Sequence, residues 1–272
     1  MGNYIYFFII FFTLSFVVAI YLIRQKKRIR QLEKLLSNSN DKLEKLQVHF
    51  GQFTPQEVIE KLTEAGGSYE PGMRTVTVLF ADLKGFTKMC DEMDPSVVVS
   101  ILNGYFRCMS EVLSNHHGRI TELIGDGLLA LFGALKTNPW QVQDAVLAAL
   151  AMRDSLKKYN EDLQSRSLPE LAFGIGIHRG NVLAGIMGNY ELSKFGVVGD
   201  PINVAARVES LTRIHNVDLL ITDTVKESLD DRFSLKEMPA LPVKGKEELI
   251  TTYWVEGLKS GVEIEADPKS KR

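Results

Sequence analysis

Hydrophobic residues follow several distinct patterns along the 272-residue chain. The first is a continuous run, Tyr4–Ile23, of twenty residues without a charge, which matches the thickness of a bilayer core. No basic residue precedes the run, and a basic cluster follows it at Arg24, Lys26, Lys27, Arg28 and Arg30. No small-residue cleavage site follows either. We therefore expect residues 1–23 to form a single-pass anchor in an inner or plasma membrane. The positive flank predicts the N-terminus outside and the rest of the chain in the cytoplasm.

The second pattern repeats at heptad spacing. Its apolar residues lie three, four, seven, three and four positions apart, at Ile29, Leu32, Leu36, Leu43, Leu46 and Phe50. Together with the basic flank it covers residues 24–50, and it predicts either a short parallel coiled coil or an amphipathic linker helix packed on its own domain. We favour the coiled coil because an anchor would confine copies to one plane. The Asn38-Ser39-Asn40 interruption would make it weak.

A capped helix start, Thr54-Pro55-Gln56-Glu57, separates this segment from the largest part of the chain. The turn Pro71-Gly72 follows that helix. We assign residues 51–72 to this connector, residues 73–258 to a globular domain, and the polar residues 259–272 to a disordered tail.

In the globular domain, β-branched and aliphatic runs alternate with helical spacing in the order strand, helix, strand, strand, helix, strand. One helix is predicted over about Pro95–Leu113, and a second begins at Asn138-Pro139. The next strands are predicted at Leu171–His178 and Val182–Met187. This βαββαβ order predicts an α+β, ferredoxin-like fold, a sheet with helices on one face.

Composition excludes several classes of protein. A formal net charge of −2 gives no bulk signal for nucleic acid. Cys90 and Cys108 form no CxxC pair, which excludes a disulfide scaffold or a zinc site. Gly174, Gly176 and Gly180 match part of a dinucleotide fingerprint, but no helix opens there, and no GxxxxGK[ST] occurs. Neither a Rossmann site nor a P-loop is therefore predicted.

Two aspartates end apolar runs. Asp82 follows the run Thr75–Ala81, and Asp126 stands at the predicted tip of the hairpin turn Gly125-Asp126-Gly127. Taken alone, each could be a structural cap or turn residue. If the two strands are neighbours, the carboxylates meet at one edge of the sheet. There they could hold Mg²⁺ or Mn²⁺, which prefer hard oxygen ligands and bind phosphates.

Four segments in order resemble the motifs of class III nucleotidyl cyclases of the membrane-anchored bacterial type. They are FADLKGFT at Phe80–Thr87, IGDGLLALFG at Ile124–Gly133, VGDPINVAAR at Val198–Arg207 and VKGK at Val243–Lys246. A diguanylate cyclase shares a similar core, but its GG[DE]EF hairpin is missing. A catalytically silent module, acting as scaffold or regulator, would usually have lost a metal aspartate or the Asn/Arg pair. Asp82, Asp126, Asn203 and Arg207 are all present, so we expect an enzyme.

The resemblance implies that the ribose 3′-hydroxyl of a nucleoside triphosphate attacks the α-phosphate, giving a 3′,5′-cyclic nucleotide and pyrophosphate. It implies that two Mg²⁺ or Mn²⁺ ions are held by Asp82, Asp126 and the Leu83 carbonyl. The phosphates would be bound by the backbone amides of Lys84, Gly85, Phe86 and Thr87, and the terminal phosphates by Lys244, with Lys246 as second choice. Asn203 would orient the ribose, and Arg207 would bind the phosphate under attack. In this family, the metal residues and the Asn/Arg pair of one site come from different chains. The resemblance therefore implies a homodimer with shared active sites.

The choice of base rests on two positions, Glu122 and Gly196. Adenylyl cyclases of the family usually carry Lys at the first, where Glu122 matches the guanylyl cyclases. A carboxylate can accept hydrogen bonds from guanine N1–H and N2–H. Gly196 has no side chain to read the base and matches neither pattern. We therefore favour conversion of GTP to cyclic GMP, with adenylyl cyclase activity (ATP to cyclic AMP) as the alternative.

Overall fold

A computed structural model describes residues 25–31, 34, 71–188, 193–242 and 249–259. The chain divides into two units, Met1–Gln56 and Glu57–Arg272. In the first unit, residues 25–31 are helical. The predicted anchor, the capped connector, most of the heptad segment and the tail after residue 259 lie outside the described residues. Within the described residues, no helix is long and apolar enough to cross a membrane.

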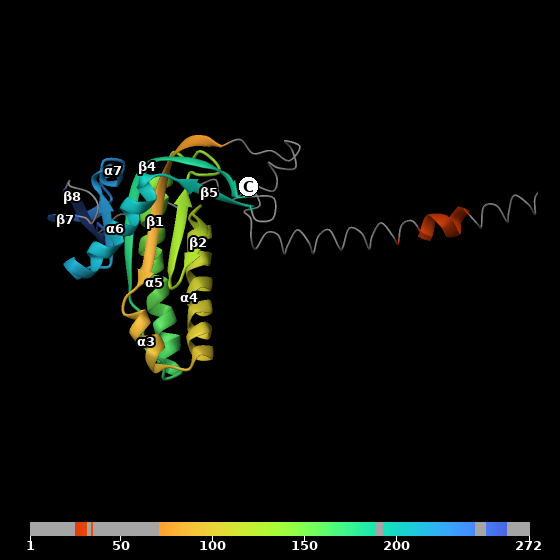
Figure 1. The fold of residues 1–272 in the computed structure, drawn as a ribbon, viewed down its shortest axis with the longest axis horizontal. Coiled ribbons are helices and arrows are strands. Elements are labelled where there is room, and N and C mark those ends of the chain that lie inside the picture. The colour runs from red at the N-terminus through yellow and green to blue at the C-terminus, as the bar shows by residue number, and fades with distance from the viewer. Residues whose placement is uncertain (1–24, 32–33, 35–70, 189–192, 243–248, 260–272) are drawn as a thin grey trace, which may run out of the picture. The chain divides into compact units, whose positions relative to one another are not determined.

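The described part of the second unit contains one eight-stranded sheet and five helices (Figure 1). The strands are β1 (Gly72–Leu83), β2 (Arg119–Ile124), β3 (Gly127–Phe132), β4 (Phe173–Gly188), β5 (Ser193–Val198), β6 (Leu219–Thr222), β7 (Phe233–Pro242) and β8 (Leu249–Leu258). The helices are α3 (Phe86–Glu92), α4 (Pro95–Asn115), α5 (Gln141–Ser165), α6 (Asp200–His215) and α7 (Asp223–Lys226). The strand order is β2-β3-β1-β4-β6-β8-β7, with β5 paired to β4.

The predicted βαββαβ order is confirmed by β1, α4, β2, β3, α5 and β4. β1 lies between β3 and β4 and pairs antiparallel with both. Its residues Leu79 and Ala81 are fully buried in the main apolar core, which also contains Ile101 of α4 and Met152 of α5. Burial of this face against α4 and α5 removes apolar surface from water and so stabilises the α+β fold.

The expectation that helices cover only one face of the sheet is wrong. Val76 and Val78, on the other face of β1, belong to an apolar cluster that contains Ala205 of α6. Helix α6 can approach β4 because the facing residue, Gly176, lacks a side chain. A Cβ built there would lie 2.3 Å from both the Ala205 carbonyl oxygen and the Glu209 amide nitrogen. Part of the glycine pattern that resembles a nucleotide fingerprint therefore serves helix packing.

The two strands predicted between Leu171 and Met187 are one strand, β4. Its full pairing with β1 runs from Phe173 opposite Leu83 to Ala184 opposite Gly72. This continuous ladder includes Gly180, which lies between the two predicted strands. The second predicted helix, α5, begins at Gln141, after the Asn138-Pro139 start, and the short helix α3 was not predicted.

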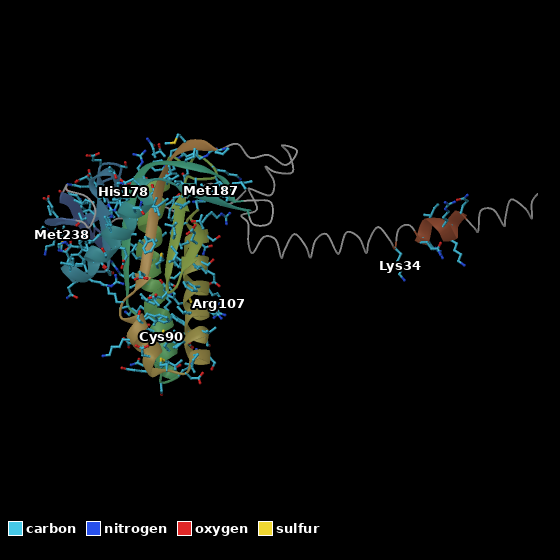
Figure 2. The ribbon with its side chains drawn as sticks, in the orientation of Figure 1. Lys34, Cys90, Arg107, His178, Met187 and Met238 are labelled. Atoms are coloured by element: carbon cyan, nitrogen blue, oxygen red, sulfur yellow. The ribbon has the colours of Figure 1, made fainter. Side chains whose placement is uncertain are left out.

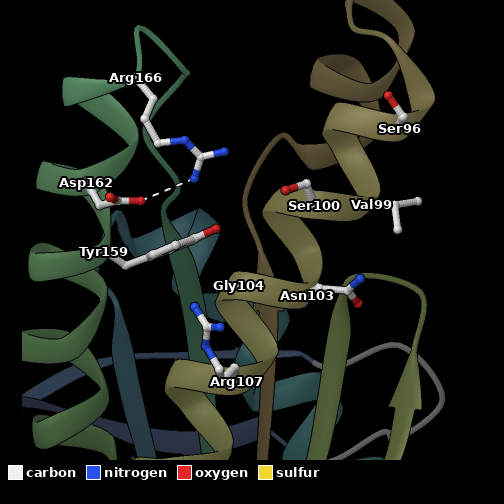
Figure 3. A pocket seen from close by; sticks show the side chains of 9 residues that line it. All are labelled: Ser96, Val99, Ser100, Asn103, Gly104, Arg107, Tyr159, Asp162 and Arg166. Carbon is white, nitrogen blue, oxygen red and sulfur yellow. Dashed lines mark hydrogen bonds and ion pairs between the residues drawn. The ribbon is translucent and has the colours of Figure 1, made fainter.

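Helices α4 and α5 contact each other through Tyr159, which lies across from Gly104 (Figure 3). The Tyr159 hydroxyl donates a hydrogen bond to the Ile101 carbonyl at 2.9 Å. A groove of about 450 Å³ adjoins this contact and is lined in part by Arg166, which pairs with Asp162 at 3.2 Å. None of the residues that line this groove belongs to the predicted site.

Both cysteines are free, as the absence of a CxxC pair suggested. Cys90 lies on α3, whereas Cys108 follows Arg107 on α4 (Figure 2).

Candidate active site

The ends of two strands bring Asp82 to the turn that carries Asp126. Antiparallel pairing places Ala81 opposite Leu128, so the end of β1 lies beside the start of β3. The turn between β2 and β3 contains Gly125, whose φ of 62° favours glycine. A Cβ built on Gly127 would lie 3.0 Å from Asp82 Oδ1. Both predicted carboxylates are therefore located at one edge of the sheet.

The negative charges of these carboxylates act on each other and on a nearby tyrosine. Burial, and then the charge of Asp82, raise the pKa of Asp126 above its usual value. Burial also raises the pKa of Tyr105, to which Asp82 and Asp126 contribute further. The Tyr105 hydroxyl is buried and has no hydrogen-bond partner among the described residues. A cation would relieve the repulsion between the two aspartates.

One arginine, which sequence reasoning missed, already contacts Asp82. Arg213 of α6 donates from Nη2 to Asp82 Oδ2 at 2.5 Å and from Nη1 to both Glu209 carboxylate oxygens at 3.0 and 3.2 Å. The Glu209 residue is only 3% exposed. Burial raises its pKa to about 7, and the nearby Arg213 partly opposes that rise. The sequence does contain a signal for the Glu209–Arg213 pair, because the i, i+4 spacing places both residues on one helix face.

The end of β1 and the loop after it carry residues predicted to bind the metal ions and the phosphates. The Leu83 carbonyl accepts a hydrogen bond from Arg213 Nη2 at 3.3 Å, so it faces the same corner. The Lys84 amide, which was predicted to bind phosphate, donates a hydrogen bond to the Ala172 carbonyl at 2.7 Å in the single chain. The Lys84 ammonium donates to the Val217 carbonyl, also at 2.7 Å, and burial lowers its pKa.

Gly85, Phe86 and Thr87 fit the predicted phosphate-binding role better than Lys84 does. Gly85 has a φ of 71° and precedes α3, which begins at Phe86. No side chain caps this helix start. The first amides of a helix have no acceptor within the helix, so the Phe86 and Thr87 amides can face a ligand.

Asn203 and Arg207 lie on α6, as the sequence predicts. On this helix, the side chains of Val204 and Val208 are buried. Asn203 is exposed, and Arg207 is half-buried. Arg207 Nη1 is buried without a hydrogen-bond partner among the described residues. Arg213, the residue of α6 that contacts Asp82, lies about 120° from Arg207 and about 80° from Asn203 around the helix.

The two positions predicted to read the base lie on different strands. Glu122 is half-buried on β2 opposite Leu129, just after a β-bulge. Gly196 pairs with Gly185 across the β4–β5 hairpin. Its neighbour Phe195 packs in the same apolar cluster as Leu129, so β5 folds back towards β3. Lys244 and Lys246 lie outside the described residues.

A family model described as "Adenylate and Guanylate cyclase catalytic domain" matches residues 68–257. The chain belongs to this family. The adenylate cyclase of Anabaena cylindrica is 34% identical over 238 residues, which cover 84% of this chain and 46% of that protein. Adenylate cyclase 1 of Rhizobium meliloti (strain 1021) is 28% identical, over 78% of this chain and 32% of its own length. The chain thus spans less than half the length of these curated relatives.

Solved structures of both nucleotide specificities resemble this cyclase domain. The guanylyl cyclase Cya2 superposes with a TM-score of 0.66 and 32% identity, over 71% of this chain and 97% of that one. A bacterial light-regulated adenylyl cyclase gives a TM-score of 0.67 and 27% identity, over 85% of this chain and 64% of that one. The comparisons therefore support the fold without deciding the base.

The residues of the cyclase domain fit the divalent ions that the family uses. Two carboxylates and a carbonyl are hard oxygen donors, and the guanidinium of Arg213 already lies against Asp82 and the Leu83 carbonyl. Within the described ranges, no three His, Cys, Asp or Glu side chains gather into a cluster that could hold a metal alone. The corner therefore suits an ion that also takes oxygens from water and phosphate, as Mg²⁺ sites often do.

Proposed function

We propose that the protein is a purine nucleotide cyclase, which converts a nucleoside triphosphate into a 3′,5′-cyclic nucleotide and pyrophosphate. The observation that carries the proposal is the Asp82 carboxylate beside the turn of Asp126, in a chain of the cyclase family. Loss of a metal aspartate would have favoured the catalytically silent module, but both aspartates are present and adjacent.

In this proposal, Asp82, Asp126 and the Leu83 carbonyl hold two Mg²⁺ or Mn²⁺ ions. When bound, such ions lower the pKa of the attacking 3′-hydroxyl and neutralise the leaving phosphates. The amides of Phe86 and Thr87, at the start of α3, bind the phosphates. Lys244 binds the terminal phosphates, a role that rests on the VKGK motif.

Asn203 and Arg207 complete the site from a second chain. Asn203 orients the ribose, and the Arg207 guanidinium donates to the α-phosphate as charge develops on it. One observation supports a homodimer. Arg207 Nη1 is buried without a hydrogen-bond partner among the described residues. A second copy would bring the two half-sites together twice.

GTP is the substrate that Glu122 favours, because its carboxylate can accept from guanine N1–H and N2–H. The 32% identity to a guanylyl cyclase of known structure supports this choice. ATP is the alternative, and the 34% identity to the adenylate cyclase of Anabaena cylindrica supports it. The two possibilities give different products and are directly separable.

Tyr4–Ile23 acts, we further propose, as a membrane anchor that leaves the cyclase domain in the cytoplasm. The support is the uncharged run and the basic cluster after it. In cells, the chain should remain in the membrane fraction after carbonate washing, and protease added outside should spare the cyclase domain. Release by carbonate would contradict the anchor.

The enzyme assay uses the purified full chain with Mn²⁺ and equal ATP and GTP, and quantifies cyclic AMP, cyclic GMP and pyrophosphate. Asp126→Asn should lower turnover by about a hundredfold or more, because it removes a metal ligand. The matched variant Asp154→Asn, at an exposed position of α5, should turn over like the wild type.

Mostly cyclic GMP would support both the enzyme and the Glu122 argument. Mostly cyclic AMP would keep the enzyme and reverse the choice of base. No cyclic product from a dimeric, Mn²⁺-binding chain would refute the proposal in favour of the silent module.

A further inference from the structure

The corner that would receive the metal already holds a positive group, the guanidinium of Arg213. Its Nη2 donates to Asp82 Oδ2 at 2.5 Å and to the Leu83 carbonyl at 3.3 Å. These two groups are the ones assigned to the metal ions. A divalent ion and the guanidinium cannot occupy the same side of these oxygens at once.

Glu209 fixes the position of this guanidinium by binding its other terminal nitrogen. Nη1 donates to both Glu209 oxygens at 3.0 and 3.2 Å, which leaves Nη2 directed at Asp82. Glu209 is itself confined, because a Cβ built on Gly174 would lie 2.4 Å from Glu209 Oε1. The buried carboxylate thus holds an arginine whose outer nitrogen reaches the predicted metal ligands.

The Arg213 side chain is exposed enough to move away from Asp82. Its side chain is 40% exposed, whereas the Glu209 side chain behind it is 4% exposed. The guanidinium can therefore turn from Asp82 towards solvent, whereas Glu209 stays in place. Without a cation in this corner, the charges of Asp82 and Asp126 would repel each other across the turn.

We propose that Arg213 is a positioning residue that substitutes for the metal. In the metal-free chain it holds Asp82 and the Leu83 carbonyl in place, and it withdraws from them when a divalent ion binds. The inference rests on the proposed function, because it takes the metal role of Asp82 from there. Arg213 therefore lowers the affinity of the nucleotide-free chain for divalent ions.

The test is a titration of Mn²⁺ into the nucleotide-free full chain, followed by electron paramagnetic resonance of the free ion. Arg213→Gln should bind Mn²⁺ about three- to tenfold more tightly than the wild type, since a half-exposed ion pair no longer competes. Arg213→Lys, which keeps the charge and loses the fork, should fall between them. The matched variant Arg232→Gln removes an Arg–Asp pair of similar exposure (32% and 38%) and should leave Mn²⁺ affinity unchanged.

Thermal unfolding gives a second measurement. Arg213→Gln should melt at a lower temperature than the wild type in EDTA, and Mn²⁺ should raise its melting temperature by more than that of the wild type. A purely structural arginine would lower the melting temperature without tightening the binding of Mn²⁺. If Arg213→Gln does not fold, the Arg213→Lys affinity decides, and a value equal to the wild type or weaker refutes the inference.

The outcomes separate this inference from the proposed function. Equal or weaker Mn²⁺ binding by Arg213→Gln, with wild-type binding abolished by Asp82→Ala, would overturn the inference and leave the metal site intact. No Mn²⁺ binding by the wild type, or binding that survives Asp82→Ala, would overturn the metal assignment and the inference together.

Discussion

The buried carboxyl of Glu209 should make the stability of the protein depend on pH in a defined direction. Burial raises its pKa from 4.5 to about 7 in the folded chain, although Arg213 partly opposes this rise. The folded chain therefore binds this proton more tightly than the unfolded chain does. The resulting contribution to stability is complete below about pH 4.5 and is lost as the pH rises through about 7.

The size of the effect follows from the same shift. One pKa unit corresponds to about 1.4 kcal/mol, so the change between about pH 5 and about pH 8 is about 2–3 kcal/mol. Glu209→Gln keeps the shape of the side chain and removes its titration. The free energy of unfolding of the wild type minus that of Glu209→Gln should therefore fall by about 2–3 kcal/mol over this pH range.

Urea unfolding of the full chain in EDTA, repeated across the pH range, measures this difference. The control Glu111→Gln makes the same substitution at an exposed position of α4 and gives the baseline for the comparison. A difference that stays constant would show that Glu209 titrates alike in the folded and unfolded chains. A difference that grows with pH would show that the ion pair with Arg213 outweighs burial, which would refute the reasoning.

The remaining predictions test packing, assembly and the choice of base. Gly176→Ala should lower the free energy of unfolding by about 1–3 kcal/mol in urea, because its Cβ would lie 2.3 Å from two backbone atoms of α6. Gly196→Ala is its control, and equal stability of the two variants would contradict the packing argument. Asp82→Ala and Arg207→Ala chains should each be inactive, and mixed equally they should regain about a quarter of wild-type turnover. Inactive mixtures that contain verified heterodimers would rule out shared sites. Glu122→Lys should lower kcat/KM for GTP relative to ATP by about tenfold or more, and an unchanged ratio would remove Glu122 from base recognition.

The positions of Asp82 and Asp126 were predictable because their signals are local. A β-branched run that ends in an aspartate marks a strand end, and Gly-Asp-Gly between two apolar runs marks a hairpin turn. The pairing of β1 with β3 then brings the two together. The same holds for Asn203 and Arg207, whose spacing on a helix after Pro201 is enough to place them on one face.

The second helical layer was not predictable from these signals. Helical periodicity identifies the buried face of α6, but it does not say which face of which sheet that helix covers. The glycine at 176 marks a close backbone approach only once the partner is known. Gly180 lies between two predicted strands, yet it belongs to one continuous strand because β1 is long enough to pair beyond it.

The ion pair of Arg213 with Asp82 was missed for the same reason. Its two residues lie 131 positions apart, and no local pattern connects them. The resemblance assigns the Lys84 amide to phosphate together with its motif neighbours, whereas in the structure this amide donates a hydrogen bond to the Ala172 carbonyl. Motif resemblance therefore transfers the position of a loop more securely than the direction of each donor in it.

The glycine at position 196 bears on how the base is read. A Cβ there would meet only the Met187 side chain, at 3.6 Å from its sulfur, which is an ordinary contact distance. Packing therefore does not require glycine at this position, in contrast to Gly176. If the site reads guanine, no side chain at 196 assists, and Glu122 is the one predicted base-reading side chain left to discriminate against ATP. A single carboxylate that lacks its donors when adenine binds can discriminate strongly only if it is desolvated, and Glu122 is half-buried in the single chain. If the proposed homodimer uses GTP, its selectivity should therefore depend on how far the second chain buries Glu122.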